Sequence, residues 1–84
     1  MKLQVLIADS DPDFQRTMTQ ALSREGDMEA AGVSSDGLET LSLIQTARPD
    51  VVLLDIIMPK MDGITVMEKV NEDPSVRKRP AFII

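Results

Sequence analysis

Short apolar runs recur along this chain, and they constrain its fold more than any other feature. Three of them are apolar at nearly every position and lack the alternation of a half-buried strand; they are Leu3 to Ala8, Val51 to Leu54 and Ala81 to Ile84. Such runs are typical of parallel strands that are covered on both faces. A weaker run, Met28 to Val33, includes Glu29 and small residues, which favours a strand at an edge of the sheet.

The segment after the first run has the signals of a helix. Asp11, Pro12 and Asp13 read as an N-cap followed by proline at the first helical position, and Gly26 is expected to stop the helix. Apolar residues then recur at helical spacing and are expected to face inward. They are Phe14, Met18, Ala21 and Leu22.

Two further helices are predicted between the later runs. The second begins at Ser35 or Asp36 and ends before Pro49, which restricts the residue that precedes it. The third is capped by Asp62 and ends before Pro74. The residues expected to face inward are Leu38, Leu41 and Ile44 on the second helix and Ile64, Met67 and Val70 on the third.

Strands and helices therefore alternate in the order β-α-β-α-β-α-β. This order predicts an α/β fold, with a parallel sheet and right-handed crossover helices on both of its faces. The flavodoxin-like strand order 2-1-3-4-5 is expected, and the chain reaches only the fourth strand of it. We therefore expect residues 1–84 to form one domain that is the N-terminal two-thirds or so of a five-unit fold.

Composition narrows the chemistry that this chain can perform. It contains no Cys and no His, which removes disulfides, thiolate sites and imidazole bases from its own residues. Its formal charge is −5 and it has no Trp or Tyr, which argues against direct binding to nucleic acid. No apolar run is long enough to cross a bilayer, and we expect a cytoplasmic protein. Carboxylates are left to do the chemistry.

Candidate functional carboxylates follow two of the predicted strands. Asp9, Ser10 and Asp11 follow the first strand, and Asp55 follows the third. Ligands of open α/β sheets bind beyond the carboxyl ends of the strands, and the expected order makes these two strands neighbours. Crowded carboxylates favour a hard cation such as Mg2+. Asp55 is then the best candidate for a nucleophile that attacks a phosphoryl group.

Two blocks of the sequence resemble the receiver domains of two-component response regulators. Residues 51–63, VVLLDIIMPKMDG, are similar to the phosphoacceptor block of that family, and residues 6–11, LIADSD, are similar to its first acidic block. The wording DIIMP, with Ala-Asp upstream, is most similar to the stage-zero A sporulation regulators. The resemblance extends from Lys2 to Ile84 and implies that residues 1–84 are the N-terminal part of a receiver domain.

The resemblance implies a role for each matching residue. Asp55 would take a phosphoryl group from the phosphohistidine of a histidine kinase or histidine phosphotransferase. Asp9 would hold Mg2+ through water, and Ile57 would bind the ion through its backbone carbonyl. Pro59 and Gly63 match the loop residues that shape the wall of the pocket. The chain itself would not be an enzyme, beyond self-dephosphorylation.

Two departures from the family pattern stand out. The second acidic position is Ser10, so either this hydroxyl or Asp11 would complete the metal site. Asp11 stands before Pro12, and a capping role is favoured for it. The family's switch residues on strands four and five would lie beyond Ile84.

Two functions remain open from the sequence. The first is a phosphoacceptor switch that controls a DNA-binding output domain of the sporulation type, which this chain does not include. The second is a receiver-like protein-interaction module that is not phosphorylated, for which Ser10 is the evidence. A metal-dependent phosphatase is disfavoured because Ile57 stands where its general acid would be. We also predict a homodimer through the exposed edge of the fourth strand, Ala81 to Ile84.

Overall fold

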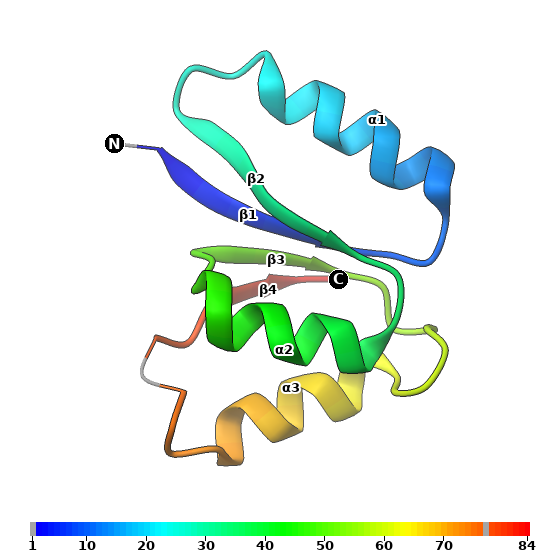
Figure 1. Cartoon of the computed structure of the whole chain (residues 1–84), viewed down its shortest axis with the longest axis vertical. Coiled ribbons are helices and arrows are strands. Elements are labelled where there is room, and N and C mark those ends of the chain that lie inside the picture. Colours follow the sequence, from blue (N-terminus) through cyan, green and yellow to red (C-terminus); the bar gives the residue numbers. More distant parts are fainter. Residues whose placement is uncertain (1, 77) are drawn as a thin grey trace.

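The computed structural model describes residues 2–76 and 78–84. Four parallel strands in this part of the chain form one sheet in the order β2-β1-β3-β4, as predicted. Helices connect successive strands (Figure 1). The elements are β1 (Leu3–Ala8), α1 (Pro12–Ser23), β2 (Met28–Ser34), α2 (Gly37–Ala47), β3 (Val51–Leu54), α3 (Gly63–Glu72) and β4 (Ala81–Ile83).

Helices cover the two faces of the sheet unequally. Figure 1 shows α1 on one face and the pair α2 and α3 on the other. Successive strand residues point to opposite faces, so Val5 and Ile7 pack with Leu22 of α1. The larger core lies under α2 and α3. Its buried members are Leu6, Ala8, Ile44, Val52, Leu54, Met58, Val66, Val70 and Val76.

The predicted helix starts are confirmed. Asp11, Asp36 and Asp62 are the N-caps of α1, α2 and α3, and each side chain accepts a hydrogen bond from a backbone N–H two or three residues ahead, at 2.8 to 2.9 Å. Such a bond satisfies one of the free N–H groups of the first helical turn. Helices α2 and α3 end before Pro49 and Pro74, also as predicted.

The predicted end of α1 is wrong. The helix ends at Ser23, and Gly26 lies in the following turn. Arg24 stays in the right-handed region and its N–H donates to the Ala21 carbonyl, while the N–H of Glu25 donates to the Leu22 carbonyl. These bonds close the last turn, so a glycine in the left-handed conformation is not needed there.

Several residues predicted to face the core are exposed instead. Phe14, Leu38 and Ile64 keep 40%, 51% and 49% of their surface accessible. All three lie in the first turn of their helix, at the end of the sheet where the strands have their carboxyl ends. Ala21 is exposed as well. Helical spacing marks the apolar face of a helix, but it does not show how far along the helix the sheet extends.

The two edges of the sheet are β2 and β4. The edge position of β2 confirms the expectation from its weaker apolar run. At β4, Ile83 keeps 55% of its surface exposed. It lies on the same face of the sheet as α1, but α1 packs against β1 and β2 and not over β4.

No helix of residues 2–76 and 78–84 has the length and apolar character needed to cross a membrane.

Candidate functional site

The carboxyl ends of β1 and β3 meet at the same edge of the sheet. Ala8 pairs with Leu54, and the N–H of Asp55 donates to the Ala8 carbonyl at 2.9 Å. Asp9 continues the ladder on the other side, where its N–H donates to the Ser34 carbonyl at 3.0 Å. Asp9 and Asp55 therefore leave adjacent strands side by side, as the strand order requires.

Both carboxylates open into one cavity of about 450 Å3. Ile57, which was also predicted to contribute to the site, lines it as well. The cavity is acidic where Asp9 and Asp55 line it and apolar elsewhere, because apolar side chains of α1, of β3 and the loop after it, and of residues 83–84 form its other walls. Those walls are Phe14, Met18, Leu53, Leu54, Ile56, Ile83 and Ile84.

Each of the two carboxylates is oriented by the backbone that follows it. One oxygen of Asp9, Oδ1, accepts the N–H of Asp11 at 2.8 Å, and Oδ1 of Asp55 accepts the N–H of Ile57 at 3.2 Å. These turns, in which a side chain binds the backbone two residues on, fix the side-chain direction without consuming the carboxylate. An ionised carboxylate has two oxygens and several lone pairs, so both groups retain capacity to bind a cation.

The loop after Asp55 is folded back tightly upon itself. The N–H of Gly63 donates to the Ile56 carbonyl at 2.7 Å. A Cβ on Gly63 would lie 2.7 Å from the carbonyl oxygen of Asp55, so a larger residue would push the loop away from the nucleophile candidate. Ile57 keeps 83% of its surface exposed, which agrees with a position where only the backbone matters.

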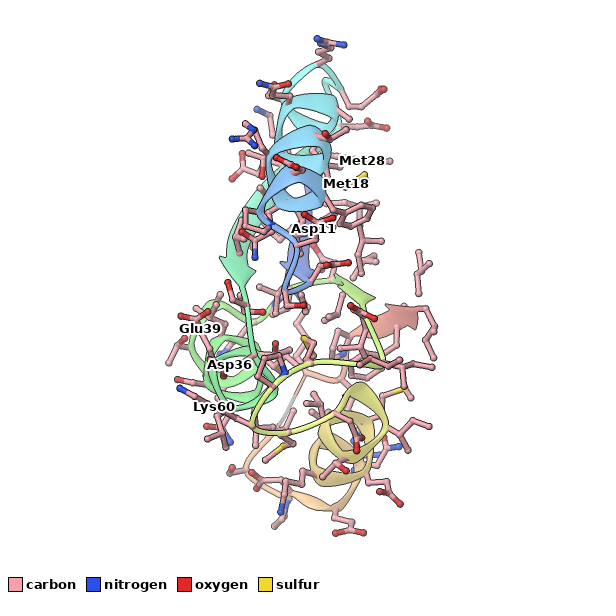
Figure 2. All side chains as sticks on the ribbon, turned by 90° about the vertical axis from the view of Figure 1, so that its right-hand side faces the viewer. Asp11, Met18, Met28, Asp36, Glu39 and Lys60 are labelled. Atoms are coloured by element: carbon pink, nitrogen blue, oxygen red, sulfur yellow. The ribbon has the colours of Figure 1, made fainter. Side chains whose placement is uncertain are left out.

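The other end of this loop rests on the start of α2. The carbonyl of Pro59 accepts the N–H of Gly37 at 3.2 Å, and a Cβ on Gly37 would lie only 1.9 Å from the Met61 carbonyl oxygen. Lys60 places its ammonium 3.7 Å from Asp36. Figure 2 shows Asp36 and Lys60 gathered there with Glu39. The loop thus has contacts with both the end of β3 and the neighbouring helix.

Ser10 and Asp11, the two residues proposed to complete the metal site, are not part of the cavity lining. Asp11 is committed to the start of α1, where its carboxylate accepts the N–H of Asp13, so its predicted capping role is confirmed (Figure 2). Ser10 is exposed. Among residues 2–76 and 78–84, no three acidic side chains are grouped in a way that could hold a metal ion. The contribution of Ser10 or Asp11 to metal binding therefore stays a prediction.

One residue at the site is not predicted from the sequence. Gln15 of α1 reaches back to the end of β1, where its Nε2 donates to the Asp9 carbonyl at 2.5 Å. The same atom lies 2.9 Å from Oγ of Ser35 and 3.3 Å from the carbonyl of Ser34. The sequence offers one indication of this contact, which is the position of Gln15 one turn into the helix that follows Asp9. A polar residue at such a position is, however, ordinarily expected to face solvent.

Comparisons with known proteins agree with this architecture. The model of the response regulator receiver domain family matches residues 5–84. Two curated relatives carry the name protein-glutamate methylesterase/protein-glutamine glutaminase. That of Thiobacillus denitrificans is 37% identical over 84 residues, or 100% of this chain and 22% of the relative. That of Methanospirillum hungatei is 44% identical over 71 residues, or 83% of this chain and 20% of the relative.

Solved structures give the same result for the fold. The response regulator domain of Thermotoga maritima CheB superimposes with a TM-score of 0.83 at 26% identity, and the match covers 96% of this chain and 57% of that one. The signal receiver domain of the putative response regulator NarL from Mycobacterium tuberculosis superimposes with a TM-score of 0.79 at 30% identity. That match covers 96% of this chain and 82% of that one. The predicted fold and family resemblance are confirmed. The narrower resemblance to the sporulation regulators finds no support in these relatives.

Proposed function

Because this chain belongs to the response regulator receiver domain family, whose members are phosphoacceptors, we propose that Asp55 is the residue that accepts the phosphoryl group. The observation that carries the proposal is the position of Asp55 directly after β3, one of the two inner strands, where it is half-buried and lines the cavity with Asp9. A carboxylate held there is reachable by a donor, and its direction is already set by the Ile57 N–H.

The proposed reaction is a direct phosphoryl transfer. A carboxylate oxygen of Asp55 forms a bond to the phosphorus, while the bond from phosphorus to the donor nitrogen breaks and its electron pair returns to the imidazole. The donor is a phosphohistidine on a histidine kinase or histidine phosphotransferase. A separate donor protein agrees with the sequence of this chain, which has no His.

The donor atoms at this edge of the sheet fit Mg2+. Asp9 and Asp55 supply hard carboxylate oxygens, and Ile57 offers a backbone carbonyl in the same loop. We propose that these three hold the ion, with Ser10 or Asp11 as a further ligand. When bound, Mg2+ would neutralise the charge on the phosphoryl oxygens. Without the ion, two carboxylates and a phosphoryl group would repel one another.

Phosphoryl labelling tests the proposal directly. The protein is incubated with acetyl phosphate or a phosphotransfer protein, with and without Mg2+, and the bound phosphoryl group is counted by intact mass. We expect one group, only in the presence of Mg2+, and none in Asp55→Asn. Asp27→Asn, at an exposed turn far from the cavity, is the matched control and should label normally. Labelling that persists unchanged in Asp55→Asn would rule the assignment out.

The alternative function is a receiver-like interaction module without a phosphorylation cycle. Ser10 favours it, since a neutral hydroxyl stands in place of the family's second acidic residue. Beryllofluoride, which mimics a phosphoryl group on a carboxylate, separates the two. Saturable binding that requires both Mg2+ and Asp55 supports the switch, and absence of binding in a folded protein supports the module.

The output of the switch is a separate proposal, because the chain spans about a fifth of the length of its curated relatives. The names of those relatives favour control of a protein-glutamate methylesterase over the predicted DNA-binding, sporulation-type output. We propose that the whole protein hydrolyses glutamate methyl esters on a protein substrate, and does so faster when Asp55 is phosphorylated. Ester hydrolysis measured with and without acetyl phosphate, beside DNA binding, distinguishes the two outputs.

A further inference from the structure

The side-chain amide of Gln15, near the start of α1, lies within hydrogen-bond distance of three acceptors. Its Nε2 lies 2.5 Å from the Asp9 carbonyl, 2.9 Å from the Ser35 hydroxyl and 3.3 Å from the Ser34 carbonyl. These acceptors belong to the ends of two different strands, β1 and β2. The side chain is half-buried, so the bonds are partly shielded from competing water.

The contact to Asp9 completes the restraint of that residue. The Asp9 N–H donates to Ser34, and its carboxylate accepts the N–H of Asp11. Gln15 holds the remaining polar group of the Asp9 backbone, its carbonyl. Gln15 therefore holds the peptide plane that follows Asp9, and rotation of that plane would displace the Asp11 N–H that orients the Asp9 carboxylate.

The orientation of the Asp9 carboxylate is important because the two residues that follow it contribute little to the site. Ser10 brings no charge to the site, and Asp11 is engaged as the cap of α1. Asp9 is left as the one carboxylate on the β1 side that opens into the cavity with Asp55. Groups that orient a metal ligand typically change metal affinity by about 10-fold to 100-fold when they are removed.

We infer that Gln15 is a positioning residue: by donating to the Asp9 carbonyl while anchored on Ser35, it holds the Asp9 carboxylate in the direction that binds a divalent cation beside Asp55. The inference rests on the proposed function of the site. Gln15 does not touch the phosphoryl group or the cation, and it acts through Asp9.

Four variants of residues 1–84, beside the unsubstituted chain, test this role by titration with Mg2+ in a calorimeter, at a temperature where circular dichroism shows all five folded. Gln15→Met keeps the length and the helix propensity of the side chain but removes the donor. Gln20→Met makes the same change at an exposed position of the same helix and is the control. Ser35→Ala removes the anchor while leaving Gln15 in place, and the fourth form combines Gln15→Met with Ser35→Ala.

We expect Gln15→Met to weaken Mg2+ binding by about tenfold, Ser35→Ala by less, and the double variant no more than Gln15→Met alone. Gln20→Met should bind like the unsubstituted chain. In phosphorylation by acetyl phosphate, the Mg2+ concentration at half-maximal rate should rise by the same factor, while the rate at saturating Mg2+ changes less. That difference separates positioning from a general loss of structure.

The outcomes separate two failures. If Gln15→Met and Ser35→Ala bind Mg2+ as the unsubstituted chain does, Gln15 has only a structural role and the inference is overturned, while the proposed function stands. Equal losses in Gln15→Met and Gln20→Met would also overturn it, since the effect would then belong to the helix. If the unsubstituted folded chain binds no Mg2+ and takes no phosphoryl group on Asp55, the proposed function fails and this inference fails with it.

Discussion

Aspartates in this chain perform different tasks, and their place relative to a strand or helix end decides which. Asp9 and Asp55 follow strands and open into the cavity, whereas Asp62 precedes a helix and satisfies its free N–H groups. The backbone N–H of Thr65, with a smaller contribution from its side chain, lowers the pKa of Asp62 below the ordinary value, because both bonds favour the ionised carboxylate. Residue type alone would not separate these roles.

The neutral residue at position 10 gives the first prediction. Ser10→Asp should tighten Mg2+ binding by about tenfold, because it adds a hard anionic oxygen next to Asp9. Calorimetric titration measures the change, and Ser10→Asn, which adds size without charge, is the matched control. If the affinity stays flat and Asp11→Ala abolishes binding, then Asp11 is a ligand in addition to its capping role.

A buried hydroxyl pair gives the second prediction. Ser34 and Thr40 are fully buried, with 2.6 Å between their oxygens, and the Thr40 hydroxyl donates to the Asp36 carbonyl at 2.8 Å. Ser34 therefore donates to Thr40. Thr40→Val should cost about 1–3 kcal/mol of unfolding free energy, because it leaves the Ser34 hydroxyl buried without its partner. Denaturant unfolding measures this cost.

A double variant checks the cause of that cost. Ser34→Ala combined with Thr40→Val removes both hydroxyls, so the combination should be less destabilised than Thr40→Val alone. If the two losses simply add, the hydroxyls do not depend on each other and the explanation is wrong.

Among the elements of the fold, the amino ends of the strands are tied together by one residue. The Asp50 carboxylate accepts the Gln4 N–H at 2.7 Å and the Lys78 ammonium at 2.6 Å. Its backbone donates to the Gln4 carbonyl and accepts the N–H of Ala81. β1, β3 and β4 are joined at this point, at the opposite end of the sheet from the candidate site.

This clamp gives a prediction about pH. The Gln4 N–H, followed by the Lys78 ammonium, lowers the pKa of Asp50 below the ordinary value of about 4. A carboxyl with a lowered folded pKa stabilises the fold above its unfolded pKa, and this stability is lost as pH falls below about 4. Urea unfolding at pH 6 and pH 3 should show a smaller pH dependence in Asp50→Asn. An unchanged dependence would contradict the clamp.

The loop between β3 and α3 contains a residue in an unfavourable backbone conformation. Lys60 has a φ of 69°, in the left-handed region where a Cβ is strained. Lys60→Gly should raise the unfolding free energy by up to about 1 kcal/mol, because the exposed contact with Asp36 that it loses is worth little. The same change in α3, Lys69→Gly, should lower it by about 1 kcal/mol. Denaturant midpoints of the two variants should therefore move in opposite directions.

The molecule as a whole is covered unequally. α2 and α3 cover one face of the sheet, and α1 lies on the other (Figure 1). Phe14 and Ile83 line the cavity beside α1 and are exposed. β4 is an edge strand of the sheet that residues 2–76 and 78–84 form. Exposed apolar residues beside an edge strand favour association.

The homodimer of residues 1–84 through β4 stays a prediction. Ile83→Lys should shift the chain towards monomer, because it places a charge at the edge strand. Ile64→Lys, a comparable exposed isoleucine on α3, is the control and should leave the association unchanged. Sedimentation over a range of concentrations decides the matter, and a folded monomer at high micromolar concentration refutes the dimer.

The sequence alone predicted the elements, their order and the two strand ends that meet at the site. Periodicity, helix caps and apolar runs are local properties. The order of residues along the chain is therefore enough to recognise Asp11 and Asp62 as helix starts and to narrow the remaining start to Ser35 or Asp36. The adjacency of Asp9 and Asp55 also follows from the strand order, because parallel strands end at one edge.

Other features depended on how the elements pack in space. Phe14 and Leu22 share the apolar face of α1 by their spacing, yet Phe14 is exposed and Leu22 is buried. Only the packed structure shows which turns of a helix the neighbouring elements cover. Gln15 meets Asp9 and Ser35 only when α1 turns back over β1 and β2. These hydrogen bonds bring together residues from three parts of the fold, and they depend on atomic positions within a fraction of an ångström. No local pattern of side chains encodes such positions.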